Sequence, residues 1–212
     1  QFKSKFFDDY KQITGSKGIG VISDCDEQPI FLHSRFGPFC IVTSGFVENA
    51  GELAKGLLYR GVSFSEVSKR KVNTPELIAK IINQAGSIID GIEKVFEKIE
   101  GSCSILLLNK DGVYAARDRL GYTPLVIGRG AAGWAVTTES GAFINIGFDV
   151  VKHREPGEIV LINSEGIAAK RAGGDVNQIC AFLWIYTGFP ASSYEDINVE
   201  TVRERCGRFL AK

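Results

Sequence analysis

The hydrophobic pattern of this chain centres on residues 101–130, where short apolar runs alternate with turn residues. Residues 104–108 and 113–116 are two of these runs, and Asp111-Gly112 separates them, which predicts a β-hairpin. A third strand is expected to begin at Pro124. Because the runs show little polar alternation, these strands are expected to be buried on both faces, at the centre of a layered sheet.

Short apolar runs on either side of this centre predict the remaining strands. Turn signals lie between them, such as Gly37-Pro38 and Pro156-Gly157. The strand at residues 39–43 is expected to stop at Ser44-Gly45. The other expected strands are residues 19–22, 29–33, 134–137 and 158–162, with residues 180–186 as a closing strand.

Helices are expected where apolar residues recur at helical spacing. Thr74 is expected to cap one helix, with Pro75 at the first helical position and Glu76 near the positive end of the helix dipole. Asn49 is expected to cap another helix. The expected helices are residues 2–13, 50–59, 75–82, 88–99 and 199–211. Their order favours a layered α/β or α+β domain over a Rossmann sheet.

Composition narrows the class of protein and the class of partner. The 212 residues suit one compact domain, or one domain with a tail. The 25 basic and 25 acidic residues cancel without a long block of either sign, which argues against nucleic acid or an anionic membrane surface as a partner. No apolar run reaches the ~18 residues of a membrane span, and no signal-peptide pattern opens the chain.

The cysteines and histidines bear on compartment and chemistry. The five cysteines are odd in number and lack CxxC spacing, so we expect buried free thiols in a reducing compartment, and hence a cytoplasmic protein. Neither metal-ligand spacing nor a nucleotide-binding glycine fingerprint occurs, so neither a metal nor a cofactor is expected. His33 and His153 have no evident catalytic partners and are expected at the surface. The chain contains no methionine, and processing, cleavage and a missing segment remain open as reasons.

Several motifs of the chain resemble one family. Residues 116–125 resemble the ARDxxGxxPL element of glutamine amidotransferases with an N-terminal nucleophile, an element that asparagine synthetases share. In amidophosphoribosyltransferases this element is followed by an SE-x-A…IG…EPGE series, a CIFEYVYFARP segment and an ARRRMG helix. The matching stretches occur in that order at residues 138–142, 146–147, 155–159, 180–190 and 202–207. Looser matches to GIG, QP, NGNLVNA and DTEVI precede them at residues 18–20, 28–29, 44–50 and 74–78.

The resemblance implies both a fold and a reaction. The fold is α+β, a four-layer αββα sandwich of the N-terminal-nucleophile hydrolase type. The reaction is glutamine hydrolysis, in which an N-terminal cysteine attacks the side-chain amide, its α-amine acts as base, and an Asn-Gly pair stabilises the oxyanion. An arginine and an acid hold the two ends of the amino acid. Ammonia then passes to a phosphoribosyltransferase domain, which makes phosphoribosylamine for purine biosynthesis.

Most positions that the resemblance assigns to the glutamine pocket hold a different residue here. Ser23 stands at the position of the pocket arginine, Ser44 at that of the oxyanion asparagine, and Thr74 at that of the aspartate. Gly45 matches the family pattern. Gln1 offers no usable nucleophile, so no catalytic residue is assigned. The alternative role of the three mismatched residues is purely structural, in loops and helix caps.

Three functions are consistent with this pattern. In the first, residues 1–178 form the glutaminase-like domain of an amidophosphoribosyltransferase-related protein, with a degenerate pocket and no glutaminase activity as the chain stands. Residues 179–212 would then form a closing strand, a connector and a C-terminal helix that lead to a phosphoribosyltransferase domain. The second is a non-catalytic binding or scaffold homologue that retains only the sandwich. The third is an intact amidotransferase whose N-terminus is absent from the sequence, with an altered substrate.

The partners expected from the resemblance are L-glutamine or another small molecule, a phosphoribosyltransferase domain, and further copies of the chain in a homo-oligomer. Arg117 and Asp118, within the best-matching motif, are expected to stabilise a turn and to take no part in catalysis.

Overall fold

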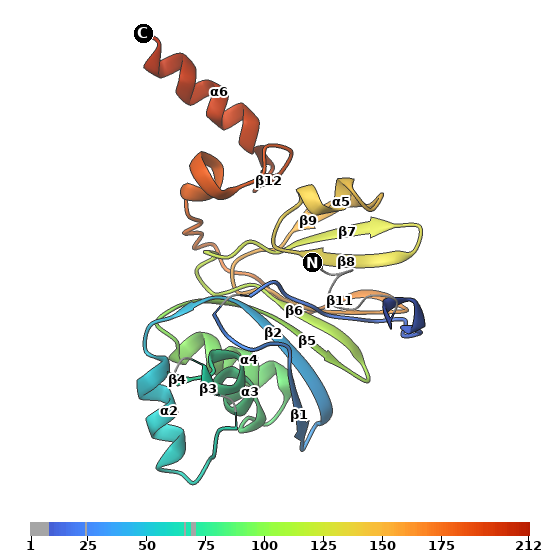
Figure 1. Cartoon of the computed structure of the whole chain (residues 1–212), viewed down its shortest axis with the longest axis vertical. Coiled ribbons are helices and arrows are strands. Elements are labelled where there is room, and N and C mark those ends of the chain that lie inside the picture. Colours follow the sequence, from blue (N-terminus) through green and yellow to red (C-terminus); the bar gives the residue numbers. More distant parts are fainter. Residues whose placement is uncertain (1–8, 24, 66, 69–70) are drawn as a thin grey trace.

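The computed structural model describes residues 9–23, 25–65, 67–68 and 71–212 (Figure 1). Its centre is a six-stranded sheet in the order β1-β2-β5-β6-β10-β11, in which every pair is antiparallel. β5 and β6 lie in the middle and are joined by the turn at Lys110 and Asp111, which confirms the predicted hairpin. The strands are β1 (Ile30–Ser34), β2 (Gly37–Val47), β5 (Gly101–Asn109), β6 (Gly112–Ala116), β10 (Ile159–Asn163) and β11 (Gly166–Arg171).

A three-stranded sheet in the order β8-β7-β9 stacks on one face of the first sheet. Ala115, Ile127, Val160 and Ile162 form the apolar contact between the two sheets. The strand expected to begin at Pro124 is predicted, with the two runs before it, at the centre of the layered sheet. As β7 it belongs instead to the second sheet, because the turn after β6 carries the chain across to that layer. These strands are β7 (Val126–Gly130), β8 (Gly133–Thr137) and β9 (Asp149–His153).

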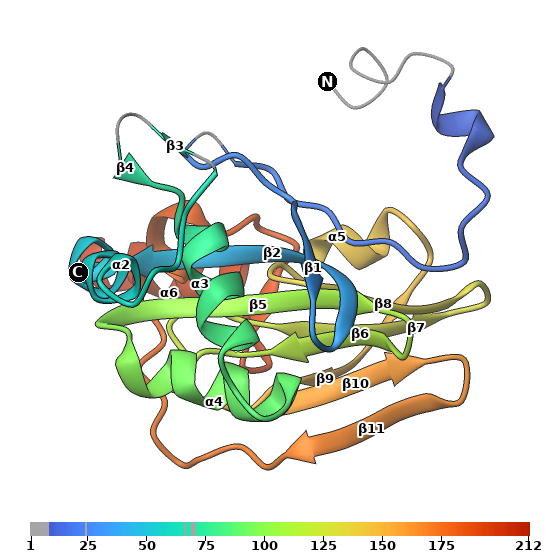
Figure 2. The ribbon, with the colours of Figure 1, turned by 90° about the horizontal axis from the view of Figure 1, so that it is seen from below.

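Helices cover the outer face of the six-stranded sheet, and one short helix packs on the three-stranded sheet. Three of them pack on the six-stranded sheet (Figure 2). Gly91 allows the second and third of these helices along the chain to approach each other closely, since a Cβ at Gly91 would lie 2.8 Å from the backbone of Ile82. On the second sheet, Phe143 of a short helix packs over Gly128 of β7. The layers follow the order helix, sheet, sheet, helix, and the fold is an α+β sandwich, as expected. The helices are α2 (Ala50–Leu58), α3 (Thr74–Asn83), α4 (Ile88–Lys98) and α5 (Gly141–Ile144).

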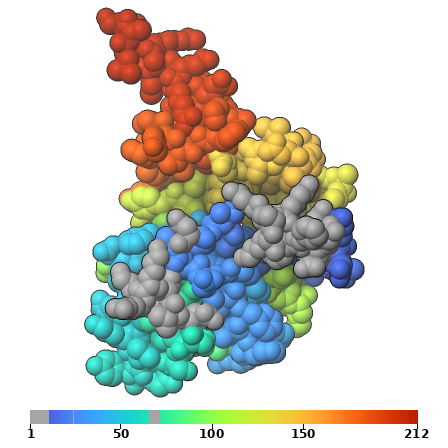
Figure 3. Space-filling model, in the orientation of Figure 1, coloured from blue at the N-terminus to red at the C-terminus, as the bar shows by residue number. Residues whose placement is uncertain are grey.

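Residues 179–212, here called the C-terminal segment, project from one end of the sandwich (Figures 1 and 3), and residues 193–195 contact it. The closing strand expected at residues 180–186 is wrong, because residues 183–187 form a π-helical turn instead. The hydrogen bonds of this run close locally, and the amide of Gly188 donates to the carbonyl of Leu183 at 2.7 Å. The elements are η2 (Leu183–Thr187), β12 (Ser193–Tyr194), β13 (Ile197–Asn198) and α6 (Val199–Leu210).

The N-terminal part departs most from expectation. Residues 2–8 of the helix expected at 2–13 lie outside the described residues, and the remainder forms only a 3₁₀ turn, η1 (Asp9–Gln12). Residues 19–22 form no strand, and the side chain of Ile22 is fully exposed. β2 does not stop at Ser44-Gly45 but pairs with β5 as far as Val47. Two short strands follow α2, β3 (Val67–Ser68) and β4 (Lys71–Val72).

Several single-residue expectations also change. Asn49 precedes α2, but its side chain makes no capping hydrogen bond to the helix. The side-chain amide instead forms hydrogen bonds with the backbone of Lys98 and Glu100. His33 is exposed as expected, whereas His153 is buried. All the cysteines are free, as expected, but only Cys103 is buried. Among the described residues, no helix has both the length and the apolar character that crossing a membrane requires.

Candidate functional site

Gly45 lies near the end of β2, opposite Cys103 of β5. Its φ is +140°, and a Cβ at this position would lie 2.2 Å from the carbonyl oxygen of Ser102. Glycine is therefore required by the close approach of β5 as well as by the backbone conformation. Ser44, one residue earlier, is half-buried and pairs with Ser104. The Ser44-Gly45 pair is thus held on the central sheet.

Residues 25–28 form a segment that is fastened beside this pair through Gln28. Gln28 accepts a hydrogen bond from the amide of Thr43 at 2.8 Å and donates to the carbonyl of Thr43 at 3.2 Å. Ser23 bonds to this segment at Asp26. Its hydroxyl accepts from the amide of Asp26 at 3.2 Å and donates to the carbonyl of Asp26 at 3.0 Å. The Ser23 hydroxyl therefore closes its own turn.

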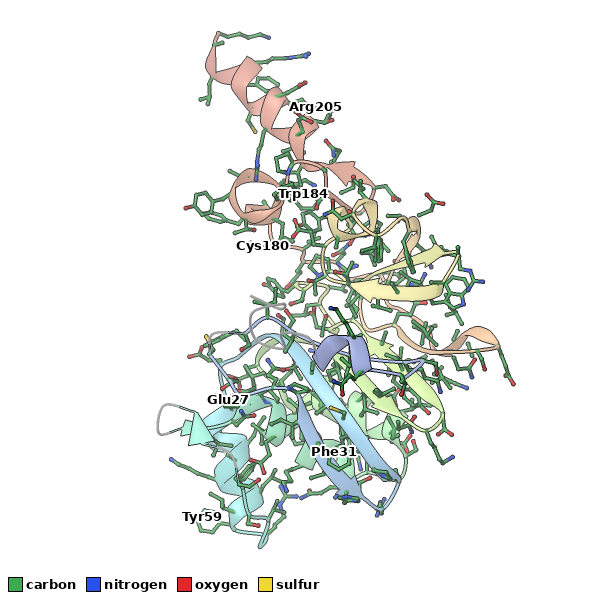
Figure 4. The ribbon with its side chains drawn as sticks, turned by 45° about the vertical axis from the view of Figure 1, so that its right-hand side comes forward. Glu27, Phe31, Tyr59, Cys180, Trp184 and Arg205 are labelled. Atoms are coloured by element: carbon green, nitrogen blue, oxygen red, sulfur yellow. The ribbon has the colours of Figure 1, made fainter. Side chains whose placement is uncertain are left out.

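The N-terminus of α3 lies against the same loop. Buried Asn73 accepts from the amide of Glu76 at 2.9 Å and donates to the carbonyl of Glu27 at 2.9 Å. Thr74 was expected to be the N-cap, but Asn73 takes that role and Thr74 is the first helical residue. The reason is that an Asn three residues before a Glu forms the stronger capping pattern. Glu27 lies beside the helix layer in Figure 4.

The structure thus connects the elements that carry all the candidate residues, through Gln28 and Asn73. Ser23 and Thr74 offer hydroxyl groups where the resemblance implies a guanidinium and a carboxylate. A hydroxyl can bond either end of an amino acid, but hydrogen bonds to charged partners of opposite sign are roughly twice as strong.

Cys103 is the cysteine nearest to this site along the sheet ladder, opposite Gly45. Its thiol is buried in the core cluster between the helices and the six-stranded sheet. Burial, and next the negative charge of Asp118, raise the pKa of Cys103 to about 12, although a hydrogen bond with Thr43 opposes them. Since the thiolate is the nucleophile, Cys103 does not replace an N-terminal cysteine.

Thiol labelling tests this assignment. Cys180 and Cys206 are exposed and are expected to react with iodoacetamide at pH 8, whereas Cys103 is expected to react at least 10²-fold more slowly until the chain is unfolded. Peptide mass spectrometry at successive times measures each rate. Labelling of Cys103 at the rate of Cys180 in the folded chain would show that this part of the core is open.

A turn behind Ser104 is held by two buried charged residues. The carboxylate of Asp118 accepts hydrogen bonds from three backbone amides of the turn, at 2.8–3.1 Å. Arg117 donates to the carbonyl of Gly121 at 2.7 Å and to that of Arg154. The two residues stabilise the turn as expected, each through backbone groups. The amide of Asp118 also donates to the Ser104 hydroxyl at 3.2 Å, which connects the turn to β5.

A separate cavity of about 310 Å³ lies where α4 meets β5. Its lining has apolar walls with one acidic and one basic residue, and it contains none of the candidate residues. The lining residues are Phe96, Ile99, Glu100, Gly101, Arg119 and Leu120.

Comparison with known proteins agrees with this geometry. The family described as "Glutamine amidotransferase domain" matches residues 17–145, a range that includes Ser23, the Ser44-Gly45 pair, Thr74 and the turn at Arg117. The chain belongs to this family. Its fold is that of the glutamine amidotransferase domain of amidophosphoribosyltransferases.

Individual relatives show how much of the chain and of the relative is shared. Amidophosphoribosyltransferase of Mus musculus is 32% identical over 207 residues, which cover 87% of this chain and 40% of the relative. That of Methanocaldococcus jannaschii is 28% identical over 215 residues, 94% of this chain and 44% of the relative. The solved glutamine phosphoribosylpyrophosphate amidotransferase from B. subtilis, complexed with ADP and GMP, has a TM-score of 0.78 at 29% identity, over 88% of this chain and 41% of that one. The chain spans less than half the length of these relatives.

Two residues organise the site in ways that the sequence analysis does not predict: Asn73, which it does not single out, and Gln28, which it names only within a motif match. Asn73 carried a usable signal, because Asn followed three residues later by Glu before an apolar run is a capping pattern. Gln28 carried none for its role, since its two bonds to Thr43 join residues 15 positions apart.

Proposed function

We propose that this chain is an amidophosphoribosyltransferase-related glutamine amidotransferase domain whose pocket no longer binds glutamine well, so that it does not hydrolyse glutamine as it stands. The observation that carries the proposal is the set of hydroxyl groups at Ser23, Ser44 and Thr74. The Ser23 hydroxyl is moreover engaged within its own turn.

The magnitudes favour loss of binding and of reaction. Losing the charge-assisted bonds to both ends of the amino acid costs about 3–6 kcal/mol, or roughly 10²–10⁴ in affinity. Losing one oxyanion donor costs a further ~10²–10³ in rate. Gly45 remains because the sheet requires it, so its presence does not argue for a retained reaction.

Glutamine titration by calorimetry tests the proposal. We expect no measurable heat of binding up to millimolar glutamine for the chain as it stands. The triple variant Ser23→Arg, Ser44→Asn, Thr74→Asp is expected to gain affinity, because it returns the implied groups to a fold that is retained. Binding by the unaltered chain at millimolar glutamine would contradict the degenerate pocket.

A second candidate function is a binding or scaffold role that uses the sandwich alone. It is supported by the buried Asn73 and Asp118 networks, which keep the site region ordered without any catalytic group. Ammonia release separates the two. The test uses the triple variant with a Met-Cys-Gly segment placed before the chain. If this variant releases ammonia from glutamine, the first proposal is favoured, because restoring the missing groups restores the reaction. If it releases none, the binding role is favoured.

The same proposal covers how the chain is divided into units and which partners it has. Residues 1–178 would form the glutaminase-like unit, and residues 179–212 the connection toward a phosphoribosyltransferase domain. The likeness to amidophosphoribosyltransferases supports this partner, and the likeness to a solved enzyme of purine biosynthesis supports a role in that pathway. A homo-oligomeric state and a cytoplasmic location are proposed with them.

A further inference from the structure

The hairpin of β12 and β13 has an unusual loop. Tyr194 pairs with Ile197, so Glu195 and Asp196 alone form the turn. Both have positive φ, 49° for Glu195 and 62° for Asp196. Such turns are normally built from Asn-Gly or Asp-Gly, because a larger side chain in the left-handed region costs about 1 kcal/mol or more. We call Glu195 and Asp196 the acidic turn; its side chains require a compensating contact.

That contact is with buried groups of the sandwich. Oε1 of Glu195 lies 2.7 Å from Nη1 of Arg117, whose side chain is fully buried. Oδ1 of Asp196 lies 3.7 Å from Nε2 of His153, but the Asp196 side chain is 93% exposed. Burial lowers the pKa of His153 despite the opposing charges of Asp196 and Glu195, so the imidazole is neutral near pH 7. The Glu195–Arg117 pair is therefore the stronger of the two contacts.

The acidic turn belongs to a hairpin that holds the C-terminal segment together. Ser193 and Ser140 exchange two hydrogen bonds at 2.8 and 3.0 Å, which fasten the hairpin to the loop before α5. The indole of Trp184 in η2 donates to the carbonyl of Ile197 at 2.9 Å, and its ring packs edge-on against Tyr194. Trp184 lies at this junction in Figure 4. A movement of the hairpin therefore involves η2 as well.

On the sandwich side, the contacts continue from Arg117 to the candidate site. Arg117 donates to the carbonyl of Gly121, and the neighbouring amide of Asp118 donates to the hydroxyl of Ser104. Ser104 is paired with Ser44 in the β2–β5 ladder. Apart from Glu195, the polar partners of the Arg117 guanidinium among the described residues are backbone carbonyls. Losing Glu195 would leave a buried cation without a carboxylate.

We propose that the acidic turn couples the C-terminal segment to the candidate site. When Glu195 leaves Arg117, the turn at residues 117–123 loosens, and so does the part of β5 that backs Ser44 and Gly45. Coupling of this kind is reciprocal, so a ligand at Ser44-Gly45 that tightens β5 also tightens the hold on the C-terminal segment. The coupling does not depend on which reaction, if any, the site performs.

Hydrogen–deuterium exchange of the complete chain, read by mass spectrometry, tests the coupling. Glu195→Gln removes the charge from the pair and is expected to raise exchange on the order of tenfold in three regions. These are residues 189–199, residues 117–123 and residues 102–105. The matched control is Asp196→Asn, which removes the neighbouring carboxylate from an exposed position and is expected to leave residues 102–105 and 117–123 unchanged.

Other outcomes overturn the coupling. Faster exchange confined to residues 189–199 would show that the turn only fastens the hairpin, and unchanged exchange everywhere would show that the ion pair restrains nothing. An equal effect of Asp196→Asn at residues 102–105 would also contradict it. If Glu195→Gln does not fold, Glu195→Asp keeps the charge with a shorter reach, and the same pattern is expected at smaller size.

Discussion

Replacing Gly45 with alanine is expected to lower the free energy of unfolding by roughly 4 kcal/mol. Two costs add. The φ of +140° is unfavourable for any residue with a side chain, and the new Cβ would lie 2.2 Å from the oxygen and 2.8 Å from the carbon of the Ser102 carbonyl. Backbone atoms cannot rotate away, so β5 would have to move from β2. Since domains of this size are stable by about 5–15 kcal/mol, the loss is a large fraction of the total.

Gly133→Ala is the matched control for this variant. Gly133 has a φ of +137°, but a Cβ there would meet nothing within 4 Å. Only the conformational cost remains, and we expect a loss of about 1 kcal/mol. Urea unfolding followed by circular dichroism measures both. Equal losses would mean that the close approach of Ser102 does not determine the residue at position 45, and Gly45 would need a functional explanation instead.

The sequence predicts the local elements of this fold better than their assembly. The β5–β6 hairpin follows from apolar runs around Asp-Gly, and α4 follows from the helical spacing of its apolar residues, so both are confirmed. The placement of β7 in the second sheet depends on the buried Arg117 turn, whose contacts to Arg154 are 37 residues apart. Periodicity carries no information about such distant partners. The failed strand at residues 180–186 has a different cause, because a short continuous apolar run fits a strand and a helical turn equally well, and this run closes its hydrogen bonds locally.

For the candidate site, too, the sequence predicts which residues are involved better than it predicts the contacts between them. Motif resemblance placed Ser23, Ser44, Gly45 and Thr74 in one region, and the structure connects the elements that carry them. Motif resemblance does not predict that Gln28 and Asn73 supply those connections. Nor did it show that Gly45 is required by Ser102, because a steric reason for a glycine depends on the strand that approaches it.

Replacing Arg117 with alanine is expected to lower the free energy of unfolding by about 3–5 kcal/mol. The guanidinium is fully buried, and it pairs with Glu195 while donating to the carbonyls of Gly121 and Arg154. Alanine would leave a carboxylate that is only 27% exposed, and two carbonyls, without their donor. Arg117→Lys keeps the charge but not the forked set of donors, and an intermediate loss is expected. Urea unfolding measures all the variants.

Arg208→Ala is the matched control, because Arg208 pairs with Glu204 at 3.6 Å with both side chains mostly exposed, and the expected loss is below about 0.5 kcal/mol. The double variant Arg117→Ala, Glu195→Ala separates the contribution of the ion pair from that of the other contacts of Arg117. It leaves no uncompensated buried charge, so its loss should be smaller than the sum of the two single losses by at least about 1 kcal/mol. Additive losses would contradict the pairing, because each residue would then be stabilised by partners that the other does not share. The acidic turn would in that case keep only the exposed Asp196–His153 contact to offset its backbone conformation.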